Sequence, residues 1–256
     1  MLKQPPVGTP RTAFTAEQYA LPYPDGIEDN YWNVARNRIV ARCLEELGVA
    51  KTDRVLDIGC GRGITVDFLR RRGFDAWGSE VATPEPISAS VAPFLRLGAD
   101  AFELPDDERR RIRTILLLDV LEHLEEPTAF LERCRERFEG CDRIVVTLPA
   151  RMELWSNYDE YYGHLHRYRI EDIRSLVPAG AFEVERQGYF FRLLYPPARL
   201  VKLLGRDRAV EIRAPKPSSR WAHRVLGAVL ELEERLLPGR LAGTSMLVAL
   251  RVVRRA

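Results

Sequence analysis

A strand-like run that passes directly into a glycine-rich turn and a helix constrains the fold of this chain most. Residues 54–58 are apolar and β-prone around the single acid Asp57, and Gly59, Gly61 and Gly63 then occupy every second position. Apolar residues recur at helical spacing after the turn. Glycines permit positive φ and let a ligand approach the backbone, and the unpaired N–H groups of a helix N-terminus favour a polar ligand. The run therefore predicts a ligand site in an α/β fold.

The spacing of these glycines separates two nucleotide-binding folds that use such a turn. A dinucleotide fingerprint, G-x-G-x-x-G, needs its last glycine three residues after the second, and Ile64 stands there. The observed pattern is D-x-G-x-G-x-G, and it resembles motif I of the class I methyltransferases that depend on S-adenosylmethionine (SAM). The resemblance implies that the methionine part of SAM lies along Gly59–Gly63, Cys60 included, and that Asp57 anchors its amino end. A turn without a ligand is the alternative.

An acid downstream stands where this family holds the ribose of the cofactor. Glu80 follows Gly59 by 21 residues, at the carboxyl end of a predicted strand over residues 75–81. The resemblance implies that Glu80, with Val81 beside it, binds both ribose hydroxyls. A solvated acid at a strand end is the alternative.

A loop after the third predicted strand resembles the segment that binds adenine in the family. Residues 99–105 read A-D-A-F-E-L-P, against G-D-A-x-x-L-P in the family. The resemblance implies that Asp100 accepts a hydrogen bond from the adenine amino group and that the Ala101 N–H meets a ring nitrogen. An Asp in a loop can also simply cap a turn.

Residues 114–120 form a nearly continuous apolar run, as expected of a central parallel strand covered on both faces. The sequence D-V-L-E-H-L-x-x-P that starts at Asp119 resembles motif IV of the ubiquinone-biosynthesis-type methyltransferases. The resemblance implies that Asp119 and Val120 line the methionine end and that His123 lies near the reacting methyl group. A role for His123 as a hydrogen bonder at the entry of the next helix is the alternative.

Residues 154–168 concentrate one Trp, four Tyr, two His and several acids in a segment that follows a predicted strand. They resemble the loop L-W-S-x-x-D-x-x-x-G-H-x-R-R-Y of a related methyltransferase subgroup. His166 replaces the usual arginine, which leaves the charge preference of the acceptor open. The resemblance implies contacts to the acceptor from Trp155, Tyr158, Asp159, Tyr161, Tyr162 and Arg167.

Transfer of a methyl group from a sulfonium needs alignment and exclusion of water, and no covalent nucleophile. A hydroxyl acceptor also benefits from a base, and histidine suits neutral pH. We expect His164 to be the base, with His123 as second candidate and Tyr168 orienting the acceptor. A metal held by His164, His166 and Asp159 lacks the spacing of known zinc sites, so no metal is expected.

One methyltransferase domain is predicted over residues 29–256. An N-terminal tail over residues 1–28 precedes it, with a loose part at 1–15 and a turn-rich part at 21–26. A helix from Asp29 to Leu47 resembles the N-terminal cap helices of small-molecule methyltransferases, and its Arg36 suits a cofactor carboxylate. A helical insertion over residues 192–242 precedes the last strand. It is interpreted as a lid, or as a basic amphipathic surface (192–240) that rests on a membrane or a lipid-linked substrate.

Composition limits the remaining alternatives. The net charge of the 256 residues is only +2, so no general attraction to nucleic acid is expected. The four cysteines form no C-x-x-C pair, and no signal peptide or run of about 18–20 apolar residues is present. We therefore expect a cytoplasmic protein, and its oligomeric state stays open.

The combined motifs predict a Rossmann-like, doubly wound sheet of seven mostly parallel strands with an antiparallel last strand. The predicted function is methyl transfer from SAM, giving S-adenosylhomocysteine, to the O or N atom of a small-molecule, glycan or lipid-linked acceptor. A catalytically silent binding protein of the same fold stays an alternative. A nicotinamide-dependent oxidoreductase is disfavoured by Ile64.

Overall fold

The computed structural model describes residues 24–254, so most of the expected tail lies outside the described residues. At the end of that tail, Ile27–Asp29 forms a 3-10 helix (η1), and Ile27 is fully buried. Asn30 caps the helix that follows by accepting a hydrogen bond from the Trp32 N–H at 3.0 Å.

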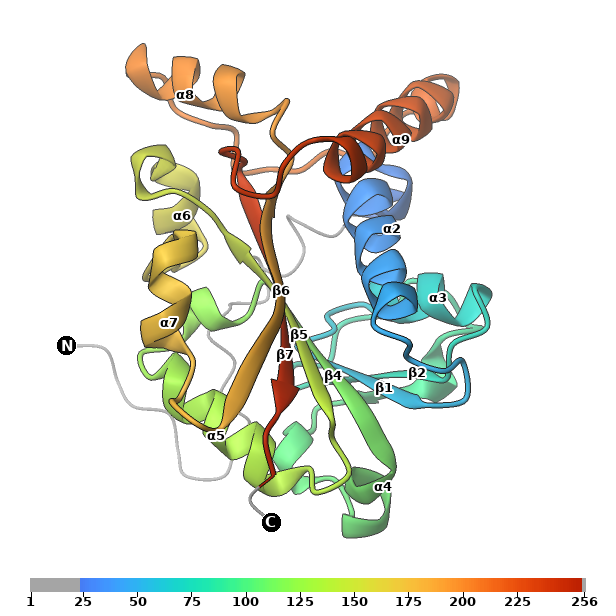
Figure 1. Ribbon diagram of the computed structural model, residues 1–256. Helices are drawn as coiled ribbons and strands as arrows, with labels where there is room; N and C mark the ends of the chain where they lie inside the picture. Colours follow the sequence, from blue (N-terminus) through green and yellow to red (C-terminus); the bar gives the residue numbers. More distant parts are fainter. Residues whose placement is uncertain (1–23, 255–256) are drawn as a thin grey trace, which may run out of the picture.

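The seven strands form one twisted sheet in the order β3-β2-β1-β4-β5-β7-β6 (Figure 1). Strands β1 to β5 run parallel, and β7 is antiparallel to both of its neighbours, which confirms the predicted sheet. The strands are β1 Arg54–Ile58, β2 Ala76–Glu80, β3 Leu95–Leu97, β4 Ile112–Leu118, β5 Arg143–Pro149, β6 Phe182–Phe190 and β7 Ser245–Val252.

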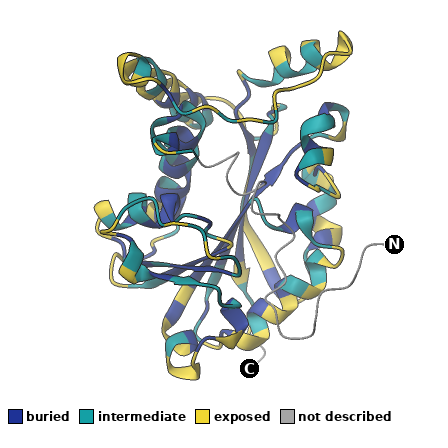
Figure 2. Cartoon of the chain, turned by 180° about the vertical axis from the view of Figure 1, so that it is seen from behind, coloured by how far each residue is buried: buried dark blue, intermediate teal, exposed yellow. Residues whose placement is uncertain are grey.

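Helices α2, α3, α5 and α7 cover the two faces of this sheet. The helices of the described residues are α2 Tyr31–Glu46, α3 Ile64–Arg71, α4 Asp106–Arg111, α5 Pro127–Arg137, α6 Asn157–Tyr161, α7 Ile173–Leu176, α8 Tyr195–Leu203 and α9 Arg220–Leu236. Figure 2 shows that the buried residues follow the strands and the inner sides of these helices. The chain between β2 and β3, which lies within the described residues, has no helix before the 3-10 turn Ala92–Phe94 (η2).

Alternation along the central strand β4 divides the apolar core into two layers. Ile115 and Leu117 pack in the layer that α5 and α7 cover, whereas Leu116 and Leu118 pack in the layer that α2 and α3 cover. All four are nearly or fully buried, as the apolar run in the sequence predicts. The sheet is therefore a rigid base, and the ends of its strands can hold polar groups in fixed positions.

The predicted insertion before β7 contains α8 and α9, and α9 packs along α2. Gly227 lies at their contact, where a Cβ atom would come within 2.8 Å of the Val34 side chain. Glu233 of α9 accepts hydrogen bonds from the N–H groups of Arg192 and Leu193 at 2.6 and 2.7 Å, which ties the helix to the start of the insertion. The two ends of the insertion are thus joined to each other, and α9 packs the insertion onto α2.

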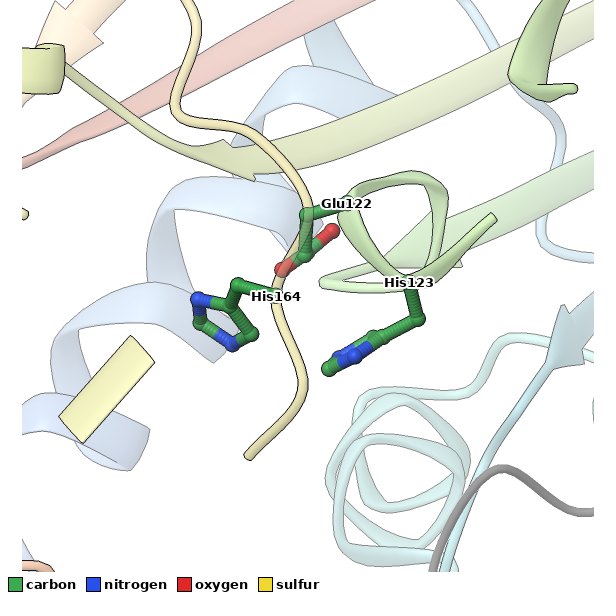
Figure 3. Close-up of side chains that lie close together, drawn as sticks. All are labelled: Glu122, His123 and His164. Atoms are coloured by element: carbon green, nitrogen blue, oxygen red, sulfur yellow. The ribbon is translucent and has the colours of Figure 1, made fainter. Parts of the chain in front are cut away.

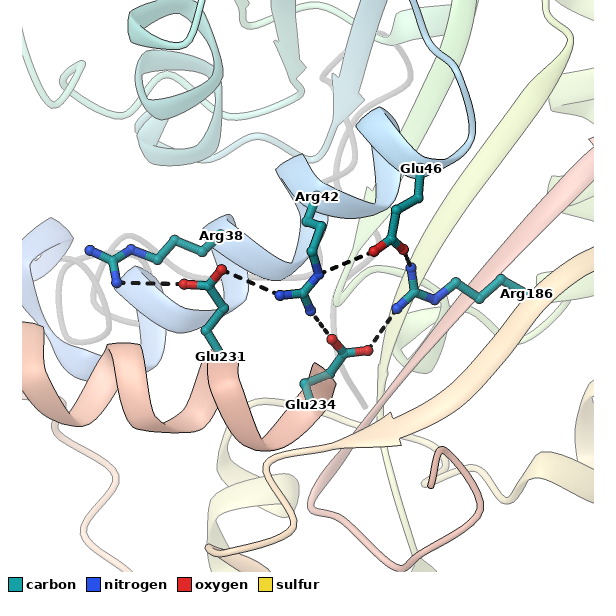
Figure 4. A network of polar contacts seen from close by, with 6 residues as sticks. All are labelled: Arg38, Arg42, Glu46, Arg186, Glu231 and Glu234. Atoms are coloured by element: carbon teal, nitrogen blue, oxygen red, sulfur yellow. Dashed lines mark hydrogen bonds and ion pairs between the residues drawn. The ribbon is translucent and has the colours of Figure 1, made fainter. Parts of the chain in front are cut away.

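A network of alternating charges reinforces the contact between α9, α2 and β6 (Figure 4). Arg42 of α2 pairs with Glu234 and Glu231 of α9, and Arg186 of β6 binds the other oxygen of Glu234 at 2.7 Å. Arg38 lies at the edge of the network, 3.6 Å from Glu231. Burial lowers the pKa of Arg42, against the opposing effect of the carboxylates around it. The network is therefore partly desolvated, and its members depend on one another.

Replacement of Glu234 with alanine is expected to lower the free energy of unfolding by about 2 kcal/mol, because two partly buried arginines lose their common partner. Arg38→Ala is the matched control and should cost less than about 1 kcal/mol, since this pair is more exposed. Urea unfolding followed by circular dichroism measures both. Equal midpoints for the two variants would contradict the role given to the network.

Candidate cofactor and acceptor site

A cavity of about 560 Å³ lies at the carboxyl ends of β1, β2 and β4. The start of α2 and the segment between α8 and α9, with Arg208, Ala209 and Ile212, complete its wall. In parallel α/β sheets this edge is the usual place for ligands, because the loops after the strands converge there.

The glycine turn between β1 and α3 contributes Gly59 and Gly61 to the cavity. Both have positive φ, 78° and 53° respectively, which a glycine adopts without steric cost. Gly63 and Cys60, also expected at the cofactor, do not line the cavity. Gly63 is needed for packing instead, since a Cβ atom there would meet the Leu95 side chain at 2.8 Å.

Glu80 stands at the end of β2, faces the cavity and is held by the backbone around it. One carboxylate oxygen accepts a hydrogen bond from the Gly61 N–H at 3.0 Å, and the other accepts one from the Ala82 N–H at 3.1 Å. Each oxygen keeps further acceptor capacity. Glu80 can therefore accept hydrogen bonds from two neighbouring hydroxyls without moving.

The expected adenine segment also reaches the cavity. Asp100 and Ala101 both line it, and Asp100 caps the 3-10 helix Ala101–Glu103 (η3) by accepting a hydrogen bond from the Phe102 N–H at 2.9 Å. The turn-cap alternative is therefore correct for one oxygen of Asp100. The cap leaves the second oxygen to serve the cavity, 3.9 Å from the Arg133 guanidinium.

An ion pair joins α2 to the end of β4. Arg36 donates to Asp119 at 2.6 Å, and its guanidinium also lies 4.6 Å from the centre of the Trp32 ring. Asp119 has a φ of 57°, an uncommon backbone conformation for a residue other than glycine. All three residues line the cavity, so a cation and an anion are presented side by side to a ligand.

The role of Asp57 as a direct anchor stays a prediction, and the structure places this residue just behind the cavity wall. Its side chain lies within β1, is 4% exposed and does not line the cavity. Burial raises the pKa of Asp57 to about 7, although the charge of Arg36 opposes this shift. The charges that act on Asp57 belong to Arg36, Glu80 and Asp119, and all three of these residues line the cavity.

On the opposite wall, a fully buried aspartate holds His164 and Arg167. Asp159 accepts hydrogen bonds from His164 Nδ1 and Arg167 Nε, both at 2.8 Å. Burial alone would raise the pKa of Asp159, but the bonds from His164 and Arg167 lower it to about 2. An ionised carboxylate can only accept, so Nδ1 of His164 carries the proton and Nε2 is the nitrogen left for the cavity.

His164 lies beside two further titratable residues, Glu122 and His123 (Figure 3). Ligand atoms of the three lie within 4.8 Å of one another. Burial, followed by repulsion from His164, lowers the pKa of His123 to about 4. Glu122 is 1% exposed, neither of its carboxylate oxygens has a hydrogen-bond partner among residues 24–254, and burial raises its pKa well above the usual range. Neutral histidines and a carboxylate are suitable ligands for a divalent cation.

This group differs from the possible metal ligands considered from the sequence, which were His164, His166 and Asp159. His166 points elsewhere, 3.8 Å from Asp172 and against the ring of Tyr168. Glu122 lies within the motif D-V-L-E-H-L-x-x-P, but the resemblance implies no role for it. Its position beside His123 was the only signal in the sequence, and the contact with His164 needs the fold.

Only some of the residues of the 154–168 segment line the cavity. Tyr158, Tyr162, Arg167, His123 and His164 line the cavity, together with Val81 and Val120. The other predicted contacts, Trp155, Asp159, Tyr161 and Tyr168, do not line it.

The predicted catalytic role of Tyr168 has no support in the structure, because this residue lies in the core and not at the cavity. It is 6% exposed, its backbone bridges to Ala150, and its hydroxyl points to the Leu121 carbonyl oxygen at 3.4 Å. The pairing with Ala150 at the end of β5 turns the ring into the core, where burial raises the pKa of the phenol above its usual range.

Comparisons with known proteins agree with this geometry. The methyltransferase-domain family matches residues 31–187, more than half of the chain. A ubiquinone biosynthesis O-methyltransferase of Cereibacter sphaeroides is 35% identical over 174 residues, which cover 54% of this chain and 64% of that protein. Another, from Roseobacter denitrificans, is 26% identical over 187 residues, 61% of this chain and 70% of that protein.

A solved structure shows the same fold. The 1,6-didemethyltoxoflavin-N1-methyltransferase of Burkholderia thailandensis, with bound S-adenosylhomocysteine, has a TM-score of 0.52 at 14% identity and covers 88% of this chain and 81% of that chain. The glycine turn, the strand-end acids around one cavity and the family match lead to one conclusion. The chain belongs to the class I SAM-dependent methyltransferases.

Proposed function

We propose that the protein transfers the methyl group of SAM to a hydroxyl oxygen of a small molecule, and that His164 activates this hydroxyl. The single observation that carries the proposal is the imidazole of His164, held by the buried carboxylate of Asp159 on the wall of the cavity. The ubiquinone biosynthesis O-methyltransferases, which are the similar proteins, are O-methyltransferases by name.

The polar residues at the strand ends of the cavity support a proposed placement of SAM. Glu80 would accept hydrogen bonds from the ribose hydroxyls, and Asp100 with the Ala101 N–H would meet the adenine. The paired charges of Arg36 and Asp119 suit the methionine end of SAM, because Arg36 would bind its carboxylate and Asp119 its ammonium group. SAM itself supplies the methyl group and the leaving group, so the protein aligns the donor and the acceptor.

The acceptor would lie between the sulfonium and His164. As the oxygen attacks the methyl carbon, the carbon–sulfur bond breaks and the hydroxyl proton passes to Nε2 of His164. Asp159 stabilises the imidazolium that results, since it already holds Nδ1–H at 2.8 Å. Tyr158 and Tyr162, whose rings are 4.6 Å apart, provide an apolar wall for a flat acceptor.

A divalent cation on Glu122, His123 and His164 is a second way to activate the same hydroxyl. The buried carboxylate of Glu122, without a hydrogen-bond partner in the described part of the chain, favours it. Asp159 would then fix a ligand histidine by its second nitrogen, as carboxylates commonly do at metal sites. Such a cation would lower the pKa of the hydroxyl by binding its oxygen.

Replacement of Glu80 with alanine is expected to raise the dissociation constant of S-adenosylhomocysteine about 100-fold, because two charge-assisted hydrogen bonds are lost. Gly61→Val should have a similar effect, since a branched side chain is strained at positive φ and fills the turn. Calorimetric titration measures both, with the exposed neighbour Glu103→Ala as control. Near wild-type affinity in both variants would refute this cofactor site.

Replacement of His164 with alanine is expected to lower turnover about 100-fold or more on an identified hydroxyl acceptor, while the affinity for S-adenosylhomocysteine changes less than about threefold. His166→Ala, in the same loop but outside the cavity, should keep wild-type turnover. Labelled SAM with a panel of phenols and catechols provides the assay. An unchanged rate in His164→Ala would remove this residue from the mechanism.

If a cation on Glu122, His123 and His164 activates the hydroxyl, EDTA is expected to reduce turnover and Mg²⁺ or Mn²⁺ to restore it, because the metal supplies the activation. Glu122→Gln should abolish this restoration and leave the affinity for S-adenosylhomocysteine unchanged. If EDTA has no effect on turnover, the cation route is wrong and His164 acts as the general base.

A further inference from the structure

The insertion carries most of the large apolar side chains that are exposed in residues 24–254. Among these side chains only Met152, Leu165 and Val184 lie outside residues 193–241. Figure 1 shows α8 and α9 extending at the same end of the molecule, and Figure 2 shows their outer sides exposed. A concentration of this kind marks an interaction surface rather than ordinary scatter.

The exposed apolar residues of α9 form a continuous stripe. Trp221, Val225, Val229, Leu232 and Leu236 follow one another at intervals of three or four residues, so they share one side of the helix. Trp221 and Leu236 are about 70% exposed. The opposite side of the helix, with Gly227 and Leu230, is buried against the domain, and the stripe therefore faces away from it.

Helix α8 adds a second apolar surface at the same end. Leu200, Leu203 and Leu204 are each more than half exposed, and Leu193 precedes the helix with a similar exposure. None of the residues of α8 is buried, so the helix has little of its surface covered by the domain.

The charge of the insertion is strongly basic. Its exposed arginines and lysines are Lys202, Arg206, Arg208, Arg213, Lys216, Arg220, Arg224, Arg235 and Arg240, whereas its exposed acids are only Asp207 and Glu211. The acids of α9 point inward, where Glu231 and Glu234 pair with arginines of the domain (Figure 4). In residues 24–254, Lys202, Arg206, Arg235 and Arg240 have no ion-pair partner. The outer surface therefore combines apolar side chains with an excess of positive charge.

We propose that α8 and α9 dock on the surface of an anionic lipid bilayer, with Trp221 and the leucines at the level of the headgroups. Each basic side chain near an anionic membrane adds attraction, and tryptophan favours the interface. Amphipathic helices with this division of residues lie in the plane of the membrane. No helix in residues 24–254 is long and apolar enough to cross it.

A second copy of the chain fits this surface less well. A symmetric dimer brings the same patch of both copies together, so the basic residues around the apolar stripe would face one another. Like charges across an interface cost free energy, whereas anionic headgroups neutralise them.

Docking in this orientation places the cavity next to the bilayer. Arg208, Ala209 and Ile212, in the chain that joins α8 and α9, line the cavity, and Tyr162 donates its hydroxyl to the Val210 carbonyl oxygen at 2.7 Å. An acceptor dissolved in the membrane could reach the cavity along this chain. The docking itself goes beyond the proposed function and does not depend on it.

The test is flotation of the purified protein with vesicles of phosphatidylcholine alone and with vesicles that contain about one third phosphatidylglycerol. We expect binding to the anionic vesicles only, with loss at high salt. Trp221→Ser combined with Leu236→Ser should reduce the bound fraction about tenfold or more, and Lys202→Glu with Arg206→Glu should do the same.

The matched controls lie elsewhere on the surface, where Val184→Ser and Arg174→Glu should bind as the wild type does. Unchanged affinity for S-adenosylhomocysteine shows that each variant is folded. The proposal is overturned if the wild type does not float with anionic vesicles, or if the insertion variants float as well as the controls. A dimer that dissociates in the Trp221 and Leu236 variant, without any flotation, would identify a second copy as the occupant instead.

Discussion

The hydrogen bond between the Gly61 N–H and the carboxylate of Glu80 joins the two strand ends on which the cofactor side of the cavity depends. It fixes the glycine turn after β1 to the last residue of β2 at 3.0 Å. A glycine is needed because φ is positive there, and an acid is needed because the turn presents an N–H group. The parallel pairing of β1 with β2 then sets the distance between them. The same pair of residues thus builds the site and would bind its ligand.

On the side of the cavity proposed to face the acceptor, a buried charge holds the side chains in place. Asp159 is fully buried, and such a charge is tolerated only when it is fully hydrogen-bonded. Ser156, His164 and Arg167 provide these bonds, and each is therefore held in one orientation. The wall formed by His164 and Arg167 is rigid for an electrostatic reason. The side of the cavity formed by Gly61 and Glu80 is rigid because backbone N–H groups hold it. Rigid walls on both sides are what an in-line transfer between two bound molecules requires.

The sequence predicted the cofactor floor better than the acceptor wall, for a physical reason. Gly59, Gly61, Glu80 and Asp100 lie at strand ends within short local motifs, and parallel pairing alone brings them together. Asp57 belongs to the same motif, but the burial of its side chain depends on the layers that cover β1. In the 154–168 segment, Tyr168 was predicted at the cavity and lies in the core, because its pairing with Ala150 is not local. Glu122 is a candidate metal ligand only because His164, which is distant in the sequence, lies beside it in the fold.

The insertion before β7 connects the charge network of α9 with the wall of the cavity. Arg42 and Arg186 hold α9 to α2 and β6, so this helix cannot open like a hinged lid without breaking a partly buried charge network. Helix α8 is held by hydrogen bonds from Tyr195 and Arg199 to Glu153, and the chain up to Ile212 by hydrogen bonds with Asn157 and Tyr162. That chain, unlike α9, lines the cavity. Access to the acceptor pocket is thus expected to depend on α8 and its following chain, while α9 stays fixed. A surface that held α8 from outside would change access to the cavity without touching the residues proposed to bind the cofactor.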